Sequence, residues 1–341
     1  MKIMMGSYQT LSISHGGPRV QILETKNELE KLGVTVSLFD VWKEFSYKEY
    51  DAFHLFAGNI GTFHIAKHIH SLGIPLVTSS IFFTRHSPFA IKSVVTANKI
   101  LHKFKKGLWS DYWLSHQIFK WSKSVLPNTT DEATLIEKGL SIPKEKITVI
   151  PNGVHSRFEN GNPTLFKKKY GIEKFILNVG HIGPERKNVL NLLRAVKTID
   201  YPVVIIGRIT SGKYYEQCKE EAAKNKNILL IDGLLNDSEM LASAYAACDV
   251  FVLPSLFETP GIAALEAGLA GAKIVITPHG GTKEYFLSMA EYVEPTSAES
   301  IRKGIINALD KKKDVQLQTH IKKEFLWSSV AEKTLNVYKT L

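Results

Sequence analysis

The stretch Asp249-Val-Phe-Val-Leu-Pro-Ser-Leu-Phe-Glu-Thr-Pro-Gly-Ile-Ala-Ala-Leu-Glu266 decides how this chain is expected to fold. Its first five residues form the short apolar run of a buried strand, and the small residues of 261–270 predict a helix. Glu258 is then expected at the carboxyl end of a strand, where open α/β sheets bind ligands. Glu266 is expected roughly two turns into the helix. One carboxylate can thus face a sugar while the other reaches a ribose of the same ligand.

The start of that predicted helix also suits an anion. Free backbone N–H groups at a helix N-terminus favour negative charge, and Pro260 has no N–H to give. A phosphate lying between the two carboxylates would therefore meet the amides of Gly261 and Ile262. If these two glutamates stood alone, the simpler interpretation would be a solvated Glu258 on a loop and an exposed Glu266 on an ordinary helix. The rest of the chain makes a ligand site the favoured interpretation.

Strand and helix patterns alternate along the chain in two series. Apolar runs predict strands at 2–5, 34–39, 51–56, 75–79, 124–126 and 147–150, and again at 175–179, 202–206, 227–231, 249–253, 273–276 and 291–293. Helical patterns lie between most of them, for example at 19–32, 65–72, 131–138, 189–198, 214–224 and 237–247. This alternation favours parallel, doubly wound sheets. The fold class expected is therefore α/β, with two Rossmann-like domains.

The two series divide near 151–163, a segment rich in turn residues. A chain of 341 residues also suits two domains of ordinary size. We predict an N-terminal domain over residues 1–155 and a second domain over 156–320. Residues 321–341 read as a C-terminal helix, a candidate for packing back on the first domain.

Composition indicates a globular protein and excludes several classes. Hydrophobic residues make up 44% and charged residues 22% of the chain. The N-terminus is apolar for too few residues to be a signal peptide, and no apolar run approaches the roughly 20 residues of a membrane span. Cys218 and Cys248 give neither a disulfide framework nor metal-ligand spacing. We therefore expect a cytoplasmic protein.

The formal charge of +10 is concentrated in residues 81–125, where eight Lys or Arg face one acid, Asp111, among many aromatic residues. Such a mixture suits a surface that meets anionic headgroups or an anionic glycan. The alternative is that the aromatic side chains are core and the lysines line the solvated faces of the same helices. The candidates for an acceptor or membrane surface are Lys103, Lys105, Lys106 and Trp109.

Two further loops bear on phosphate binding. Gly16 and Gly17 follow the first predicted strand and let the backbone approach a ligand closely, although a simple tight turn is the alternative and no G-x-G-x-x-G or P-loop pattern is present. Arg186 and Lys187 follow strand 175–179 and can pair with a diphosphate. A solvated basic pair is the alternative there, but it would oppose the dipole at a helix start.

Metal binding has little support in the sequence. The chain contains no Asp-x-Asp and no His-x-x-Glu-His grouping. His64 and His68 have i, i+4 spacing but lack a third convincing ligand. We expect no metal.

Together these segments resemble the retaining nucleotide-sugar glycosyltransferases of the GT-B fold, most closely glycosyltransferase family 4. The residues that carry the resemblance are Asn178-Val-Gly-His-Ile-Gly-Pro-Glu-Arg-Lys187, the 249–266 stretch, Gly271-Ala-Lys-Ile-Val275, Gly280-Gly-Thr-Lys-Glu284, Val149-Ile-Pro-Asn-Gly-Val154 and the Gly16-Gly17 pair. The resemblance implies two domains facing a cleft. The first would hold the acceptor and the second a nucleotide-sugar, a UDP- or GDP-sugar, with no metal or other cofactor.

The resemblance also implies roles for individual residues. Lys187 would neutralise the leaving diphosphate with help from Arg186, and Glu258 would hold sugar hydroxyls. Since charge develops on the diphosphate as its bond breaks, cations and oriented N–H groups can stabilise that step without a metal. The donor-binding candidates are Gly16, Gly17, His181, Gly261, Ile262 and Glu266.

The chain departs from the family at two positions. His181 stands where the family usually has a basic residue, so Arg186 is expected to supply part of that charge. The family often has a histidine after the strand at 75–79 that touches the donor sugar, and by spacing Ile81 falls there. His86 is the candidate to replace it as a catalytic residue.

The leading hypothesis is a retaining hexosyltransferase of glycan biosynthesis. It would act on a glycan or lipid-linked acceptor and dock peripherally on the inner face of a membrane. One alternative is a nucleotide-sugar epimerase of the same fold. A second is a basic nucleic-acid-binding protein, suggested by the pI of about 9.3, but no recognition motif accompanies the charge, so we expect no nucleic-acid partner.

Overall fold

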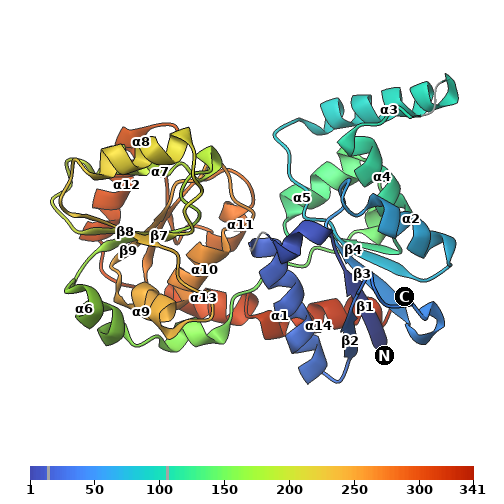
Figure 1. The fold of residues 1–341 in the computed structure, drawn as a ribbon, viewed down its shortest axis with the longest axis horizontal. Helices are drawn as coiled ribbons and strands as arrows, with labels where there is room; N and C mark the ends of the chain where they lie inside the picture. The colour runs from blue at the N-terminus through green and yellow to red at the C-terminus, as the bar shows by residue number, and fades with distance from the viewer. Residues whose placement is uncertain (14–15, 105–106) are drawn as a thin grey trace. The chain divides into compact units, whose positions relative to one another are not determined.

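The computed structural model describes residues 1–13, 16–104 and 107–341, without the side chain of Lys103. It divides into two α/β units (Figure 1). The first unit comprises Met1–Asn152 together with Trp327–Leu341, and the second comprises Gly153–Leu326. The division lies three residues before the predicted end of the first domain. The second unit extends six residues past its predicted end at 320.

The first unit is built on a five-stranded sheet in the order β2-β1-β3-β4-β5, in which all strands are parallel. Its central strand β3 is buried at all five positions. Burial on both faces explains why this strand does not alternate between buried and exposed positions. The strands are β1 Lys2–Gly6, β2 Thr35–Leu38, β3 Ala52–Phe56, β4 Leu76–Ser79 and β5 Ser124–Leu126.

Helices surround this sheet, and Figure 1 shows α3 and α4 on one side of the unit and α1 with α14 on another. Two of them begin with side-chain caps, in which a hydroxyl satisfies an N–H of the first turn. Ser110 accepts from the Trp113 amide, and Thr129 accepts from the Glu132 amide. The helices are α1 Gly17–Lys31, α2 Phe63–Ser71, α3 Pro88–Phe104, α4 Asp111–Trp121, α5 Thr130–Thr134 and α14 Trp327–Tyr338.

The second unit contains a six-stranded parallel sheet in the order β11-β10-β9-β6-β7-β8. Its strands are β6 Ile176–Val179, β7 Val203–Gly207, β8 Ile228–Asp232, β9 Val250–Leu253, β10 Lys273–Ile276 and β11 Glu291–Tyr292. Its helices are α6 Pro163–Tyr170, α7 Val189–Val196, α8 Lys213–Ala222, α9 Glu239–Ala247, α10 Ile262–Leu269, α11 Thr282–Phe286, α12 Ala298–Asp310 and α13 Gln316–Glu324. Apolar cores cover both faces of the sheet.

The prediction of one helix over 321–341 is wrong. The segment contains the end of α13 and the whole of α14, and the two belong to different units. They are separated where the Val154 amide donates to Phe325 O and Val154 bridges Leu326. These contacts use backbone groups that a continuous helix would need for itself. A periodic sequence pattern does not register such a competing backbone partner.

The last helix, α14, is part of the core of the first unit. Trp327, Val330 and Ala331 are buried with residues of β1 and β3. The Tyr338 hydroxyl lies 2.5 Å from Nδ1 of His54, whose Nε2 lies 2.9 Å from Ser79 Oγ. Burial lowers the pKa of His54 to about 3, so this ring is a neutral connector between strand and helix.

The predicted strand at 147–150 is also wrong. Only Ile147 forms a bridge, to Val125, and a short 3-10 turn at Lys144–Lys146 precedes it. The Ile150 amide donates to Pro127 O, beyond the end of β5. An apolar run alone does not distinguish a strand from an extended segment with a single bridge, since both bury alternate side chains.

Candidate functional site

Glu258 lies in the loop that follows β9, at the carboxyl edge of the second sheet. Its backbone pairs with the loop after β10: the Glu258 amide donates to His279 O at 3.0 Å, and the Gly281 amide donates to Glu258 O at 3.0 Å. Gly280 has φ of +90°, and a β-carbon there would lie 2.0 Å from Glu258 O. Only glycine allows this approach, so the adjacent glycines 280 and 281 hold the Glu258 backbone.

Lys187 and Arg186 reach the same place from the loop after β6. They lie in a 3-10 turn, Glu185–Lys187. Lys187 Nζ is 2.6 Å from Oε1 of Glu258, and Arg186 Nη1 is 3.6 Å from that oxygen. Arg186 also donates to Phe257 O at 3.0 Å. The fold therefore brings together Glu258, Lys187 and Arg186, which were predicted as catalytic, although Glu258 is 71 positions from Lys187 in sequence.

The carboxyl of Glu258 is ionised in this setting. The residue is 7% exposed, and burial by itself would raise its pKa. The positive charges of Lys187 and Arg186, with the hydrogen bond from Lys187, outweigh burial and lower the pKa below the ordinary 4.5. The site thus holds one carboxylate and two cations, groups that can bind sugar hydroxyls and phosphate oxygens respectively.

A residue that the sequence analysis did not single out fixes the basic loop. Asn188 directly follows Lys187 with φ of +58°, a conformation in which asparagine is enriched. Its Nδ2 donates to Pro254 O at 2.9 Å and to Pro295 O at 2.6 Å. Asn188 thereby ties the Lys187 turn to the end of β9. The only sequence signal was an asparagine between a basic pair and a helix.

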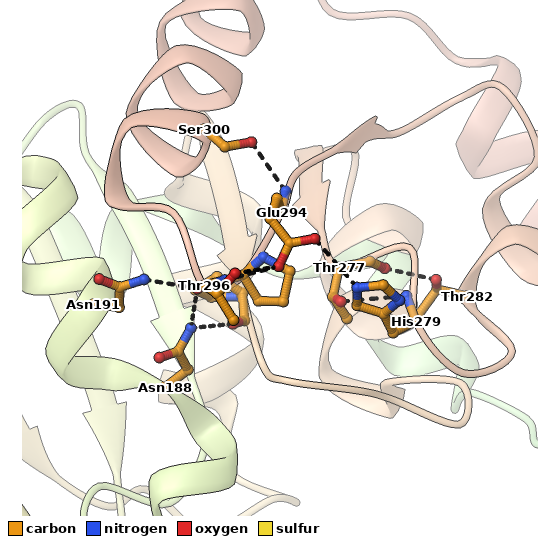
Figure 2. A network of polar contacts seen from close by, with 10 residues as sticks. Asn188, Asn191, Thr277, His279, Thr282, Glu294, Thr296 and Ser300 are labelled. Atoms are coloured by element: carbon orange, nitrogen blue, oxygen red, sulfur yellow. Dashed lines mark hydrogen bonds and ion pairs between the residues drawn. The ribbon is translucent and has the colours of Figure 1, made fainter. Parts of the chain in front are cut away.

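Figure 2 shows the polar contacts of Asn188 and of the neighbouring loops. Asn191 of α7 also donates to Pro295 O, at 2.7 Å. Glu294, the residue before Pro295, makes two further contacts. One of its carboxylate oxygens, Oε2, lies 3.4 Å from His279 Nε2, and the other accepts hydrogen bonds from the amide and hydroxyl of Thr296. Because His279 O accepts a hydrogen bond from the Glu258 amide, the contacts of His279 help to hold the Glu258 backbone in place.

Glu266 is buried on α10, so an exposed position for it is excluded. The residue is 4% exposed. Tyr245 donates to its Oε2 at 2.7 Å, and Asn236 Nδ2 donates to its Oε1 at 3.0 Å. Burial and the Glu266 charge keep the pKa of the Tyr245 hydroxyl well above 10, so it remains a donor. Neither donor is indicated by the sequence alone, because nothing local links Tyr245 or Asn236 to Glu266.

The helix start between the two glutamates differs slightly from expectation. Helix α10 begins at Ile262, with Gly261 as its N-cap at φ of +89°. Glu266 is therefore just over one turn into the helix and not two, at about 3.6 residues per turn. The N–H groups of the first turn have no partner within a helix, so the backbone at Gly261 and Ile262 retains the character expected of a phosphate site.

His181 lies in the loop between β6 and the Lys187 turn. The backbone there is closely packed, since a β-carbon on Gly207 would lie 1.6 Å from Gly180 O. The Ile182 amide donates to Arg208 O, and Thr210 donates back to Ile182 O. These bonds fix the loop that carries His181 against the end of β7.

The remaining candidates belong to the first unit. Gly16 and Gly17 form the start of α1, with Gly16 as N-cap. His86 is exposed just before α3, and its Nδ1 lies 2.7 Å from the Tyr112 hydroxyl. Trp109 is exposed. Lys105 and Lys106 lie outside the described residues, as does the side chain of Lys103.

One carboxylate of the first unit was not predicted. Glu132 is 3% exposed and accepts from Ser80 Oγ at 2.5 Å, from the Phe82 amide at 2.7 Å and from the Asn128 amide at 2.8 Å. It joins the loops after β4 and β5. Between Ser80 and Phe82 lies Ile81, the position of the expected sugar-contacting histidine, with φ of +44°.

Among residues 1–13, 16–104 and 107–341, no group of three or more His, Cys, Asp or Glu could hold a metal ion. Within the same residues, no helix is both long and apolar enough to cross a membrane.

Both units match known protein families. The model described as Glycosyltransferase Family 4 matches residues 15–158, and the model of Glycosyl transferases group 1 matches residues 164–324. An uncharacterized glycosyltransferase of Methanocaldococcus jannaschii is 30% identical over 223 residues, which is 58% of this chain and 55% of that protein.

A second relative has a stated activity. The UDP-Gal:alpha-D-GlcNAc-diphosphoundecaprenol alpha-1,3-galactosyltransferase of Escherichia coli is 28% identical over 264 residues, or 72% of this chain and 62% of that protein. The matched stretches thus span between half and two thirds of these two relatives. Among solved structures, Anabaena HepE in complex with UDP and glucose covers 100% of both chains, with a TM-score of 0.72 and 16% identity. This likeness shows the shared fold.

Proposed function

The chain has the GT-B fold and resembles glycosyltransferase family 4, and from this premise we propose that it transfers a hexose from a nucleotide-sugar to a glycan or lipid-linked acceptor. The observation that carries the proposal is the cluster of Lys187, Arg186 and Glu258 at the carboxyl edge of the second sheet. The second unit binds the donor and the first unit binds the acceptor.

The donor is held by complementary charge. Its diphosphate bears negative charge that Lys187 and Arg186 can meet with charge-assisted hydrogen bonds. Ionised Glu258 accepts hydrogen bonds from sugar hydroxyls, and Glu266, oriented by Tyr245, accepts from the ribose. In the structure, Lys187 pairs with Glu258 at 2.6 Å. Donor binding exchanges this pair for phosphate on the lysine and hydroxyls on the carboxylate, so neither charge is left buried and unpaired.

The same groups promote the reaction. As the bond from the anomeric carbon to the diphosphate breaks, negative charge grows on the departing oxygen. Cations already fixed in place stabilise that charge without reorganisation. The acceptor hydroxyl oxygen bonds to the anomeric carbon on the face that the diphosphate leaves, and its proton passes to the departing diphosphate oxygen. This retains the configuration, as in the family that the chain resembles. This chemistry requires no metal.

The comparisons support two features of the substrates. The Escherichia coli relative is named for a UDP-sugar donor and a diphosphoundecaprenol acceptor, and HepE is solved with UDP and glucose. These names favour a UDP-sugar over a GDP-sugar donor and a lipid-linked acceptor. An acceptor of that kind would place the enzyme at the cytoplasmic face of a membrane.

A thermal-shift series tests the donor site. UDP, GDP, ADP and CDP are added to the wild-type protein, to Lys187→Ala and to Lys197→Ala, which removes an exposed lysine on the same unit. At 100 times Kd, a ligand adds about 2.7 kcal/mol to native stability. One nucleotide should raise the Tm of the wild type and of Lys197→Ala, with a smaller shift in Lys187→Ala. Equal shifts in all three proteins would remove Lys187 from the donor site.

Turnover assays then distinguish the reactions. Incubation of a UDP-sugar with and without a lipid-linked acceptor should give a glycosylated product only in the presence of the acceptor. Epimerised nucleotide-sugar formed without acceptor would overturn the transferase assignment in favour of an isomerase. A glycosidic bond of inverted configuration in the product would contradict the retaining step alone.

A further inference from the structure

The helix α3 of the first unit has three different faces, and among the side chains that the structure describes only one face packs against the rest of the unit. Its buried face is the stripe Ile91, Val95, Asn98 and His102, spaced as one side of a helix. Ile91 and Val95 are buried. Asn98 accepts from the Ser110 amide at 2.7 Å, and the His102 ring lies 5.1 Å from that of Trp113. These contacts account for the attachment of α3 to the unit.

A second face of α3 is apolar and exposed. Phe89 and Phe104 are 81% and 83% exposed, and Ile100, Leu101 and Val94 are exposed as well. Side chains of this kind ordinarily lie in a core. Contiguous exposed apolar surface marks a site that meets another apolar phase. Figure 1 shows α3 at the margin of the first unit, with its C-terminal end extending past α4.

The third face is basic. Lys92 and Lys99 are exposed and lie seven residues apart, so they share one side of the helix next to the apolar face. Lys103 follows four residues after Lys99, which is about one further turn of the helix, with its side chain outside the described residues. Beyond the helix, Leu108 and Trp109 are exposed, Trp109 to 56%. Asp111 is the only acid in 81–125, so this basic edge has few internal counter-charges.

We propose that the exposed face of α3, with Leu108 and Trp109, docks into the surface of an anionic lipid bilayer. An interfacial helix has an apolar face that enters the headgroup boundary and lysines beside it that meet anionic lipid. Tryptophan favours the same depth, since its ring is apolar and its N–H polar. The inference deepens the proposed function by naming the surface at which the first unit meets a lipid-linked acceptor.

Charge distinguishes this occupant from a protein partner. Interfaces between proteins are depleted of lysine at their core, whereas an anionic membrane attracts each lysine with about 1 kcal/mol, roughly a five-fold gain in partition. The apolar residues of α3 lie on one convex helix, a shape that enters a fluid lipid phase without a matching groove. Both properties favour a bilayer over a second protein.

The test is co-sedimentation of the full chain with vesicles of phosphatidylcholine alone or mixed with phosphatidylglycerol. The wild type should pellet with the anionic vesicles only, and less at high salt. Lys92→Glu with Lys99→Glu should weaken the partition by ten-fold or more. The matched control, Lys168→Glu with Lys303→Glu, makes the same charge change at exposed lysines of the second unit and should bind as the wild type.

A second pair of variants tests the apolar face. Phe89→Ser with Phe104→Ser should reduce binding on the order of ten-fold or more, whereas Trp42→Ser, which removes a 92% exposed aromatic elsewhere on the first unit, should not. Since all these side chains are exposed, circular dichroism should show unchanged folding. Brominated lipid should quench tryptophan fluorescence in the wild type, and less in Trp109→Phe.

Several results would overturn the proposal. Equal pelleting with neutral and anionic vesicles would do so, as would unchanged binding by both α3 variants. If Phe89→Ser with Phe104→Ser instead abolishes a concentration-dependent dimer seen by sedimentation velocity, the face is an interface between copies of the chain. Binding to vesicles requires neither donor nor turnover. The nucleotide thermal shift should be retained in every α3 variant, so failure here is separate from failure of the proposed function.

Discussion

Glu132 of the first unit and Glu258 of the second are both buried carboxylates that follow a strand of a parallel sheet, but they differ in their partners. Glu132 accepts hydrogen bonds from two backbone amides and a hydroxyl. Glu258 pairs with the side chains of Lys187 and Arg186. Backbone donors cannot leave without the loops that carry them, whereas side-chain cations can turn toward a ligand. Burial alone therefore does not mark a binding carboxylate; the kind of partner does.

The largest effect expected from this comparison concerns the stability of the first unit. Glu132→Ala would leave three buried donors unsatisfied, at a cost of about 1–3 kcal/mol each, so we expect a loss of at least roughly 3 kcal/mol. Urea unfolding followed by tryptophan fluorescence measures it. Glu137→Ala, at a nearby helical position, is the control. A midpoint equal to that of the wild type would show that Glu132 does not hold the loops after β4 and β5.

The next effect concerns turnover. Glu258→Ala should lower kcat by roughly 10²–10³, the value of one contact that stabilises transition-state charge, while the protein stays folded. Glu258→Gln keeps the shape and should recover part of the loss if hydroxyl binding, more than charge, is needed. Steady-state kinetics with saturating acceptor measures both variants. Turnover close to that of the wild type for Glu258→Ala would remove this residue from the catalytic site.

A smaller effect is expected where a neutral donor orients the second glutamate. Tyr245→Phe deletes the hydrogen bond to Glu266, a net contribution of about 1 kcal/mol. If Glu266 binds the ribose, KM for the donor should rise about five-fold while kcat changes little. Isothermal titration with the nucleotide provides an independent reading. A change confined to kcat would contradict a binding role for this pair.

The smallest effect concerns pH. The pKa of Glu258 is lowered in the folded protein, so its ionisation contributes stability above the unfolded pKa, and this contribution is lost as the pH falls through the folded pKa. The wild type should therefore lose stability relative to Glu258→Gln as the pH falls below about 4.5. Thermal melts of both proteins from pH 7 to pH 3 measure the difference. A constant difference in Tm across that range would mean that the pair does not stabilise the fold.

Much of the fold follows from local pattern. Eleven of the twelve predicted strands correspond to strands in the structure, because a buried parallel strand leaves an apolar run that is readable by itself. The segment at 147–150 failed because its apolar residues line an extended segment beside β5 with a single bridge. The helix at 321–341 failed because Val154, far away in sequence, takes the backbone of Phe325 and Leu326.

The mixed stretch 81–125 shows the same limit for side chains. In sequence, Phe82, Phe89, Phe104 and Phe119 are equivalent. In the structure, Phe82 and Phe119 are core, whereas Phe89 and Phe104 are exposed on α3. Which aromatic residue is buried depends on which side of the helix meets the sheet, and the stretch carries apolar residues on more than one side.

By itself, the sequence determined that two parallel α/β domains form, that Glu258 follows a strand and that glycines and basic residues lie at the ends of other strands. These properties depend on near neighbours along the chain. Only the tertiary structure decided that Lys187 and Arg186 reach Glu258, that Tyr245 and Asn236 orient Glu266 and that Asn188 ties the basic turn to β9. These contacts join residues tens of positions apart, and strand order, which sets their proximity, leaves no trace in local periodicity.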